Sequence, residues 1–289
     1  MTGPTTQFIA EISSNHGQEL GRCLSFVEAA VASGCDAVKF QMFEIDKLFS
    51  KEVLANSQKH REREAWELPE AFLKPIALAC QNSGISFGCT PFYLDAIQKL
   101  VAYVDFFKIA SYELLWDELI RACSETGKPI ILSTGMATLK EVMHAVEVAK
   151  RAGAKDLTVL HCVSAYPAPL EQCNLAAIET IRQNTGCKAG WSDHTVNSGV
   201  IHRAIHKWDA KIIEFHLDLD GKGEEYGSGH CWLPDKIEEI IKQIREAKVT
   251  DGDGIKEPVP SEISDRQWRT DPSDGLRPFK SIRKTFSTK

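Results

Sequence analysis

The sequence contains no apolar run long enough to span a membrane and no block of basic residues. Its formal charge of -6 over 289 residues argues against a nucleic-acid surface. Residues 1–7 are too polar for a signal peptide, and the nine cysteines form no C-x-x-C pair. We therefore expect a cytoplasmic protein with free thiols, in which small molecules are the partners and neither nucleic acid nor a membrane is bound.

What the sequence does contain is a repeated unit of an apolar strand, a short polar turn and an amphipathic helix. The expected strands are 8–14, 37–43, 85–92, 104–111, 129–135, 157–163, 188–194 and 211–218. The expected helices are 20–33, 69–83, 93–102, 115–126, 139–152, 175–185, 200–209 and 234–249. Eight such units predict an α/β protein with a single-domain (β/α)8 barrel over residues 1–250. An open doubly wound sheet is the alternative, although no G-x-G-x-x-G follows the first strand.

Two stretches interrupt the repeat. Residues 44–68 form a long connection with a charged run, and connections of this length in compact domains are often lids over a site. Residues 251–289 are polar and rich in proline and serine. We expect them to form a tail that packs on the barrel or stays partly loose, rather than a second folded domain.

Two of the expected strands end in histidine, in the strings GWSDHT and IIEFH. Consecutive parallel strands of a barrel open into one pocket, so His194 and His216 are predicted to lie together there. Imidazole is a good ligand for divalent transition metals, and a nearby carboxylate can fix the tautomer of a ligating histidine. Asp193 and Glu214 are the acidic neighbours that could do so.

The other strand ends carry lysines, hydroxyls and carboxylates. Two lysines among several hydroxyls favour a phosphate site, because ammonium groups supply charge and hydroxyls supply directed hydrogen bonds. A lysine flanked by apolar strand residues finds anionic partners only at the barrel mouth. Together with the histidines, this indicates a metal-assisted lyase, aldolase or synthase that acts on a phosphorylated substrate. The residues concerned are Glu11, Lys39, Gln41, Thr90, Lys108, Ser111, Glu113, Ser133, Ser164, Tyr166 and Ser192.

Longer strings allow a sharper interpretation. FIAEISSNHG, DAVKFQMF, CTPF, FKIASYE, KPIILSTGMATLKE, LHCVSAYPAP, GWSDHT and IIEFH resemble, in order and spacing, the N-acetylneuraminate (sialic acid) synthase family. The resemblance covers residues 8 to about 218. It implies a transferase that condenses phosphoenolpyruvate with N-acetylmannosamine, or a related 2-acylamino sugar, to give a nine-carbon 2-keto-3-deoxy acid and phosphate. It also implies a divalent metal, Mn²⁺ or Mg²⁺, and a homodimer.

The same resemblance assigns roles to the residues at the strand ends. His194 and His216 are the implied metal ligands. Glu11, Gln41, Glu113 and Tyr166 are expected to face the sugar and the reacting carbons. The implied phosphoenolpyruvate site is Lys39, Thr90, Lys108, Ser111, Ser133, Ser164 and Ser192, with Ser164 standing where many members have asparagine.

The sequence departs from the family in its last part. Members commonly carry an antifreeze-like domain that lends an arginine to the sugar site, and we expect this chain to lack it. An arginine of the tail, Arg277 before Arg269 or Arg283, is the expected substitute. The stretch GKGEEYGSGHCWLPD replaces the family's Gly-Pro-Asp segment, and Glu224, Glu225 and His230 are candidates for the missing aspartate.

Two other functions fit the same residues. One is a Schiff-base aldolase that uses Lys39 or Lys108, and the other is a non-catalytic sugar-phosphate binding protein.

Overall fold

The computed structural model describes residues 6–286, and its centre is a ring of eight parallel strands. Strand β1 pairs with both β2 and β8, which closes the sheet into a barrel. The eight strands are β1 Gln7–Glu11, β2 Ala37–Met42, β3 Ser86–Pro91, β4 Phe106–Ile109, β5 Ile130–Ser133, β6 Leu157–Cys162, β7 Lys188–Asp193 and β8 Ile212–Leu217. The predicted (β/α)8 barrel is confirmed, and the open sheet is excluded because β1 and β8 are joined.

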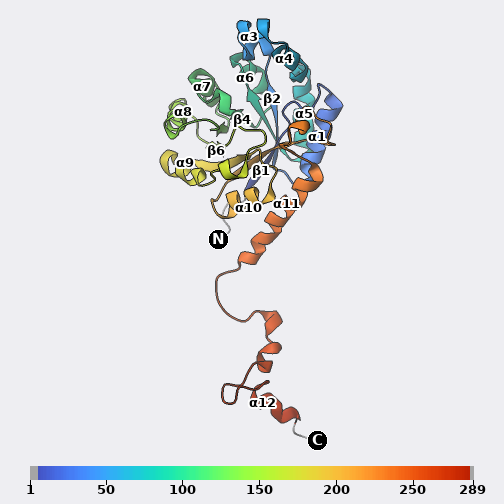
Figure 1. The fold of residues 1–289 in the computed structure, drawn as a ribbon, viewed down its shortest axis with the longest axis vertical. Coiled ribbons are helices and arrows are strands. Elements are labelled where there is room, and N and C mark those ends of the chain that lie inside the picture. The colour runs from blue at the N-terminus through green and yellow to red at the C-terminus, as the bar shows by residue number, and fades with distance from the viewer. Residues whose placement is uncertain (1–5, 287–289) are drawn as a thin grey trace. The chain divides into compact units, whose positions relative to one another are not determined.

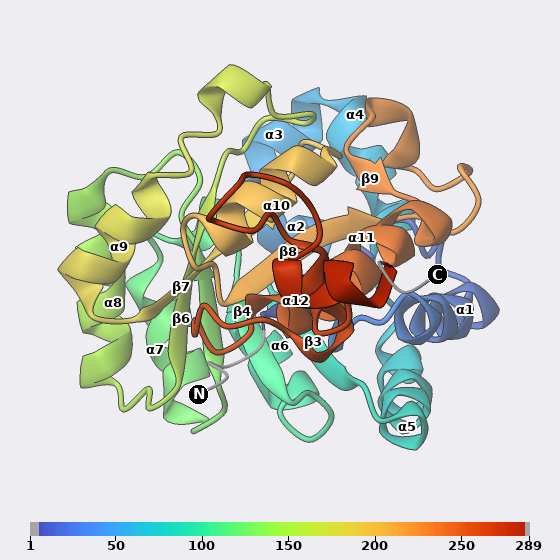
Figure 2. The same cartoon turned by 90° about the horizontal axis from the view of Figure 1, so that it is seen from below.

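Helices follow the strands and surround them (Figure 1, Figure 2). They are α1 Leu20–Ala32, α5 Leu73–Ser83, α6 Leu94–Leu100, α7 Asp117–Glu125, α8 Leu139–Arg151, α9 Ala177–Thr185, α10 Ser198–His206 and α11 Pro234–Ala247. A short extra strand, β9 (Cys231–Trp232), pairs with the last residues of β8 and was not predicted. The expected helices are present, with ends that differ by a few residues.

Local sequence signals fix several helix ends. Thr138 caps α8 through a capping box: Thr138 Oγ1 accepts from Glu141 N at 3.4 Å, and Glu141 Oε2 accepts from Thr138 N at 2.7 Å. Helix α5 ends at Gly84, which adopts a φ of +68°. Only glycine adopts this left-handed conformation without steric cost, so the chain turns there toward β3.

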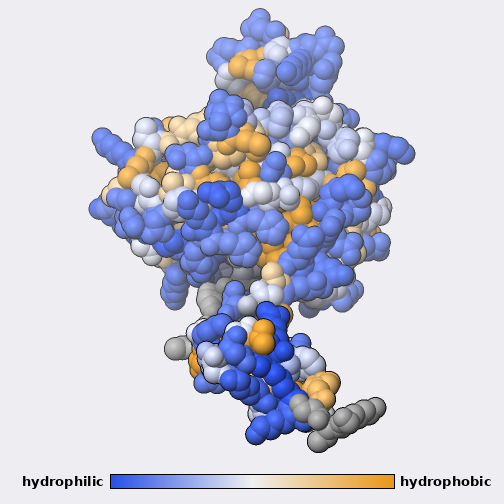
Figure 3. Space-filling model, turned by 60° about the horizontal axis from the view of Figure 1, so that its bottom comes forward, coloured by the Kyte–Doolittle hydropathy of each residue, from blue (hydrophilic) through white to orange (hydrophobic). Residues whose placement is uncertain are grey.

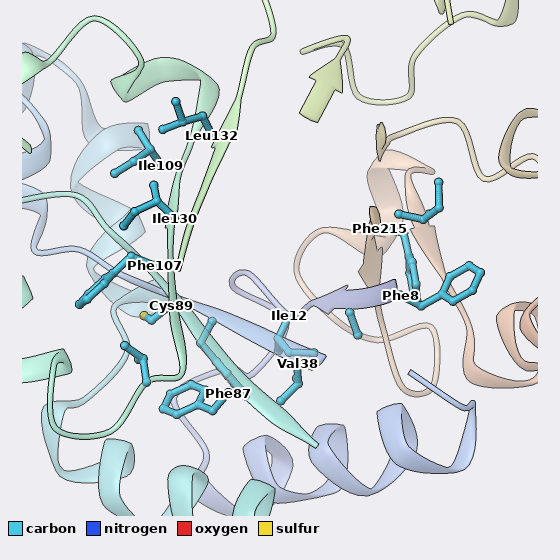
Figure 4. Packing of buried hydrophobic residues seen from close by; sticks show 14 of the residues in the cluster. Phe8, Ile12, Val38, Phe87, Cys89, Phe107, Ile109, Ile130, Leu132 and Phe215 are labelled. Atoms are coloured by element: carbon cyan, nitrogen blue, oxygen red, sulfur yellow. The ribbon is translucent and has the colours of Figure 1, made fainter. Parts of the chain in front are cut away.

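Strand side chains alternate between two environments. Those that point outward pack against the helices in the main core, and Figure 4 shows Phe8, Val38, Phe87 and Phe107 among them. Those that point inward at the amino-terminal end form a small separate apolar cluster. It consists of Ile9, Ala37, Phe106, Ile131, Leu160 and Ile212. Because side chains two positions apart share a face, the next inward residue on these strands lies at the carboxyl end, or mouth, of the barrel.

The long connection at 44–68 is helical rather than an irregular loop. It contains α2 (Ile45–Leu48), α3 (Lys51–Asn56), α4 (Gln58–Arg61) and a 3₁₀ helix at Glu62–Trp66. Gln18 Nε2 donates to the carbonyls of Glu64 and Glu67 at 2.9 and 3.0 Å, which ties the connection to the loop after β1. Its role as a lid stays a prediction.

By its contacts the chain divides into two units, 1–245 and 246–289. Within the second unit, short 3₁₀ helices and α12 (Lys280–Arg283) are joined by contacts of their own. Arg283, for example, pairs with Asp274. The proposal that Arg277 reaches a sugar site stays a prediction.

The surface in Figure 3 is mainly hydrophilic, with apolar side chains scattered over it. Among the described residues, no helix combines the length and the apolar character needed to cross a bilayer. All nine cysteines are free, and every one except Cys35 is buried. They therefore pack as small apolar side chains, as expected.

Candidate active site

A buried lysine–carboxylate pair joins the first two strands at the mouth. Lys39 and Glu11 are register partners on β2 and β1 and form an ion pair. Lys39 Nζ also donates to Thr90 Oγ1 at 2.8 Å, and Gln41 Nε2 donates to Glu11 Oε1 at 3.0 Å. Four of the predicted site residues, from three neighbouring strands, thus form one connected group.

A second buried pair lies between β4 and β8. Lys108 Nζ is 3.3 Å from Glu214 Oε1, and Ser192 Oγ donates to the same oxygen at 2.9 Å. Burial alone would raise the pKa of Glu214, but the attraction of Lys108 and Lys39 outweighs it and holds that pKa well below its usual value. Burial also lowers the pKa of Lys39 to about 8, against the attraction of Glu214. Sequence reasoning placed Glu214 at the mouth but gave it no role in the substrate site.

Two serines, Ser111 and Ser164, lie against Gly135, which follows β5. Ser111 Oγ accepts from Gly135 N at 2.9 Å. A Cβ on Gly135 would collide with Ser164 Oγ, so only glycine lets these serines approach the backbone here. The hydroxyls of Ser133 and Ser164 are buried without a hydrogen-bond partner in the described structure. Such groups are rare, and the acceptor oxygens of an anion would satisfy both.

The two predicted metal ligands lie side by side. The ring centres of His194 and His216 are 5.2 Å apart, and the ring of Tyr166 lies 4.2 Å from that of His194. His194 Nδ1 lies 2.8 Å from the carbonyl oxygen of Val163 and donates to it, which leaves Nε2 free. Burial lowers the pKa of His216 to about 4, against the attraction of Glu225, so this imidazole is neutral near pH 7. A neutral imidazole is the form that binds metals.

The expectation that Asp193 and Glu214 orient these histidines is wrong. Asp193 precedes His194 directly, so its side chain points to the opposite side of the strand, where it accepts from the indole N–H groups of Trp191 and Trp232 at 3.0 and 3.1 Å. Glu214 points into the barrel but lies one layer deeper than His216, beside Lys108.

The carboxylate that contacts His216 is Glu225, in the loop after β8. Its Oε2 lies 2.8 Å from His216 Nδ1 and 3.5 Å from His230 Nε2. The ring centre of His230 is 4.6 Å from that of His216. Of the three loop candidates, Glu225 and His230 reach the histidines, whereas Glu224 is exposed. Nothing in their spacing along the sequence distinguishes them.

Glu113 is a buried carboxyl group whose pKa is raised. Burial raises its pKa to about 7, although the charge of Lys108 opposes the shift, and its Oε2 has no hydrogen-bond partner in the described structure. A carboxyl group with a pKa near 7 can both accept and release a proton at neutral pH.

The donor set near His216 is suited to a divalent metal ion. Potential ligand atoms of His216, Glu225, His230 and Cys231 all lie within 4.8 Å of one another. His230 is 4% exposed, and its Nδ1 has no partner in the described structure. The mouth of the barrel therefore holds three kinds of group: the side chains of Lys39 and Lys108, buried serine hydroxyls without a hydrogen-bond partner, and the potential metal ligands near His216. Together they are able to bind a small anion beside a metal ion.

Comparison with known proteins gives one consistent result. The model of the NeuB family matches residues 26–256. An uncharacterised protein of Methanocaldococcus jannaschii is 35% identical, over 90% of this chain and 76% of that protein. N,N'-diacetyllegionaminic acid synthase of Campylobacter jejuni is 32% identical, over 89% of this chain and 80% of the enzyme. The crystal structure of the sialic acid synthetase from Leptospira borgpetersenii, in complex with citrate, superposes with a TM-score of 0.79 at 27% identity and covers 94% of this chain and 93% of that one.

Proposed function

This chain belongs to the NeuB family, and on that premise we propose that it condenses phosphoenolpyruvate with the open-chain aldehyde of a 2-acylamino sugar. The products are a nine-carbon 2-keto-3-deoxy acid and phosphate. N-acetylmannosamine and its relatives are the candidate acceptors. The observation that carries the proposal is the pair of unpartnered buried hydroxyls, Ser133 and Ser164, at the barrel end that holds the buried Lys108 and Lys39.

Different residues of the mouth are suited to bind different parts of phosphoenolpyruvate. The hydroxyls of Ser133 and Ser164 are suited to the phosphate oxygens, which accept hydrogen bonds that these hydroxyls otherwise lack. Lys108 and Lys39 supply the positive charge that a trianionic substrate requires. Both lysines are already paired with carboxylates, so the substrate enters a preorganised array and is not bound by flexible surface chains.

The reaction joins C3 of phosphoenolpyruvate to the aldehyde carbon. The aldehyde oxygen takes up a proton and becomes a hydroxyl, water adds to C2 and loses a proton, and the C2–O bond to phosphate breaks as the C2 carbonyl forms. Glu113, whose pKa is raised to about 7, can take the proton from that water. A divalent ion held by His194 and His216 would supply Lewis-acid stabilisation of the negative charge that develops on the aldehyde oxygen. Tyr166 and Gln41 flank the space that the acceptor would occupy.

A Schiff-base aldolase is the competing function, because burial lowers the pKa of Lys39 to about 8. However, Lys39 Nζ is engaged by Glu11 and Thr90. An amine held in an ion pair is not a free nucleophile, so we favour a role in binding.

The test is phosphate release from phosphoenolpyruvate across a panel of 2-acylamino sugars, with and without Mn²⁺. The matched control for each sugar is its alditol, which lacks the aldehyde and cannot react. Phosphate that appears only with an aldehyde acceptor supports the proposal. Binding of phosphoenolpyruvate without turnover on any acceptor would instead support a sugar-phosphate binding protein, and a lysine adduct trapped by borohydride would support the aldolase.

A further inference from the structure

The loop after β8 places two ionisable side chains against His216. Glu225 Oε2 is 2.8 Å from His216 Nδ1, and the same oxygen is 3.5 Å from His230 Nε2. The side chains of His216, His230 and Glu225 are 11%, 5% and 20% exposed. One carboxylate oxygen therefore faces two imidazole nitrogens in a largely buried space.

The other oxygen of Glu225 is fixed from the opposite side by the loop after β1. Ser13 Oγ donates to Glu225 Oε1, and Ser14 Oγ donates to the same atom at 3.1 Å. Glu225 N donates to Asn15 Oδ1 at 2.9 Å. The two serines satisfy Oε1, so the orientation of the carboxylate leaves Oε2 directed at the imidazoles.

Two further features hold the loops together. Arg22 donates from Nε to the carbonyl of Asn15 at 2.7 Å and from Nη2 to Asp218 Oδ1 at 2.9 Å, which connects the loop after β1 with the end of β8. A Cβ on Gly223 would collide with the side chains of Asn15 and Asp218, so the chain can pass there only as glycine. The position of Glu225 is therefore built into the fold.

The spacing of the facing atoms is that of ligands around one ion. With metal–ligand bonds of about 2.1 Å, neighbouring ligand atoms lie about 3.0 Å apart in an octahedral shell and about 3.4 Å apart in a tetrahedral one. The two separations at Glu225 Oε2 are 2.8 and 3.5 Å. Cys231 contributes a thiol to the same group of atoms, all within 4.8 Å of one another.

We propose that Glu225 and His230 are further protein ligands of the divalent ion that His194 and His216 bind, so that a carboxylate and a third imidazole join the two histidines around it. Such a set leaves positions open for substrate oxygens. Imidazole donors also favour transition ions such as Mn²⁺, Fe²⁺, Co²⁺ or Zn²⁺ over Mg²⁺. The inference deepens the proposed function, since it specifies which side chains hold the ion of that site.

The experiment measures metal binding without substrate. Metal-free protein is titrated with Mn²⁺, followed by the electron paramagnetic resonance of the free ion, and with Co²⁺, followed by its visible absorption. Glu225→Gln and His230→Gln should each weaken binding by about 100-fold or more, because even the loss of a partner that only orients a ligand costs about 10–100-fold. Each should also change the Co²⁺ spectrum. The control, Glu224→Gln, replaces the exposed neighbour and should bind as the wild type does.

Two results would overturn the inference. One is an affinity within about twofold of wild type in both folded variants. The other is weaker binding with an unchanged Co²⁺ spectrum, which would mean that Glu225 only orients His216. If Glu225→Gln does not fold, the result for His230→Gln decides. We expect that variant to fold, because in the described structure the ion-pair contact of His230 is the 3.5 Å approach of its Nε2 to Glu225, and its Nδ1 has no hydrogen-bond partner.

The metal-binding titration and the phosphate-release assay can fail independently of each other. If the variants lose the metal but wild type releases no phosphate with any acceptor, the metal ligands stand and the synthase proposal fails. If wild type is an active synthase while both variants bind metal normally, the synthase proposal stands and this inference fails.

Discussion

The two ends of the barrel are built from the same strands and yet differ in kind. At the amino-terminal end, or floor, the inward residues of β1, β5 and β8 are Ile9, Ile131 and Ile212, and they line a cavity of about 350 Å³. Two positions further along β1 and β8, the inward residues are Glu11 and Glu214. A shift of one side-chain layer thus replaces an apolar cluster with buried ion pairs.

The carboxylates at the two ends have different partners. Asp36 accepts from Phe8 N, and Asp105 accepts from Phe87 N, each at 2.8 Å, so the floor aspartates cap the beginnings of strands. At the mouth, Glu11 and Glu214 face lysines inside the barrel. Burial of such pairs contributes little to stability and often lowers it. The comparison teaches that the floor is organised for folding, whereas the mouth keeps costly charges that only a ligand or a reaction explains.

We expect the largest effect on stability and turnover when the buried charges of the mouth are replaced by apolar side chains like those of the floor. Lys108→Met leaves Glu214 buried without its nearest counter-charge, and we expect the free energy of unfolding to fall by about 3–5 kcal/mol. Adding Glu214→Leu should recover most of that loss, because an apolar pair of similar size suits a buried site. Urea unfolding measures both. A double variant that is no more stable than Lys108→Met would contradict the comparison, and turnover should be absent in either case.

The next largest effect is a loss of turnover when an imidazole of the mouth is removed. His194→Ala and His216→Ala should each lower kcat about 10²–10³-fold, the usual cost of removing one electrostatic stabiliser of a transition state. Steady-state phosphate release with the best acceptor measures this. Near-normal turnover in both variants, or full activity of the wild type after exhaustive chelation, would remove the histidines from the mechanism.

A smaller effect is expected on the pH dependence of stability and of the reaction rate, through the ionisation of Glu113. Burial raises its folded pKa from 4.5 to about 7, so its contribution to stability is complete below pH 4.5 and is lost as the pH rises through 7. Glu113→Gln should therefore flatten the decline in unfolding free energy between pH 5 and pH 8. The same variant should lose the pH–rate limb near 7. An unchanged stability slope would mean that this carboxyl is ionised throughout the range.

The smallest effect should come from the floor itself. Ile131→Val removes one methylene group from the apolar cluster, and we expect a loss of about 0.5–1.5 kcal/mol in unfolding free energy with no change in kcat or KM. Thermal unfolding and steady-state kinetics on the same preparation provide the comparison. A marked change in KM for phosphoenolpyruvate would show that the two ends are coupled.

The sequence by itself determined the features that depend on neighbours along the chain. The alternation of strand and helix is local and appears in the structure as predicted. The stop at Gly84 and the cap at Thr138 also depend only on residues close by in the chain. Because strand side chains alternate with a period of two, the strand-end positions also indicated which lysines and histidines point into the barrel.

Only the tertiary structure decided how loops far apart in sequence meet. Asp193 lies next to His194 in the chain but bonds to the distant Trp232, whereas Glu225 reaches His216 because Ser13 and the loop after β1 hold it there. The conformation of an irregular loop is set by such nonlocal contacts, which no periodicity encodes. The physical reason is that strand pairing fixes the positions of strand ends, while each loop adopts the path that satisfies its own polar groups.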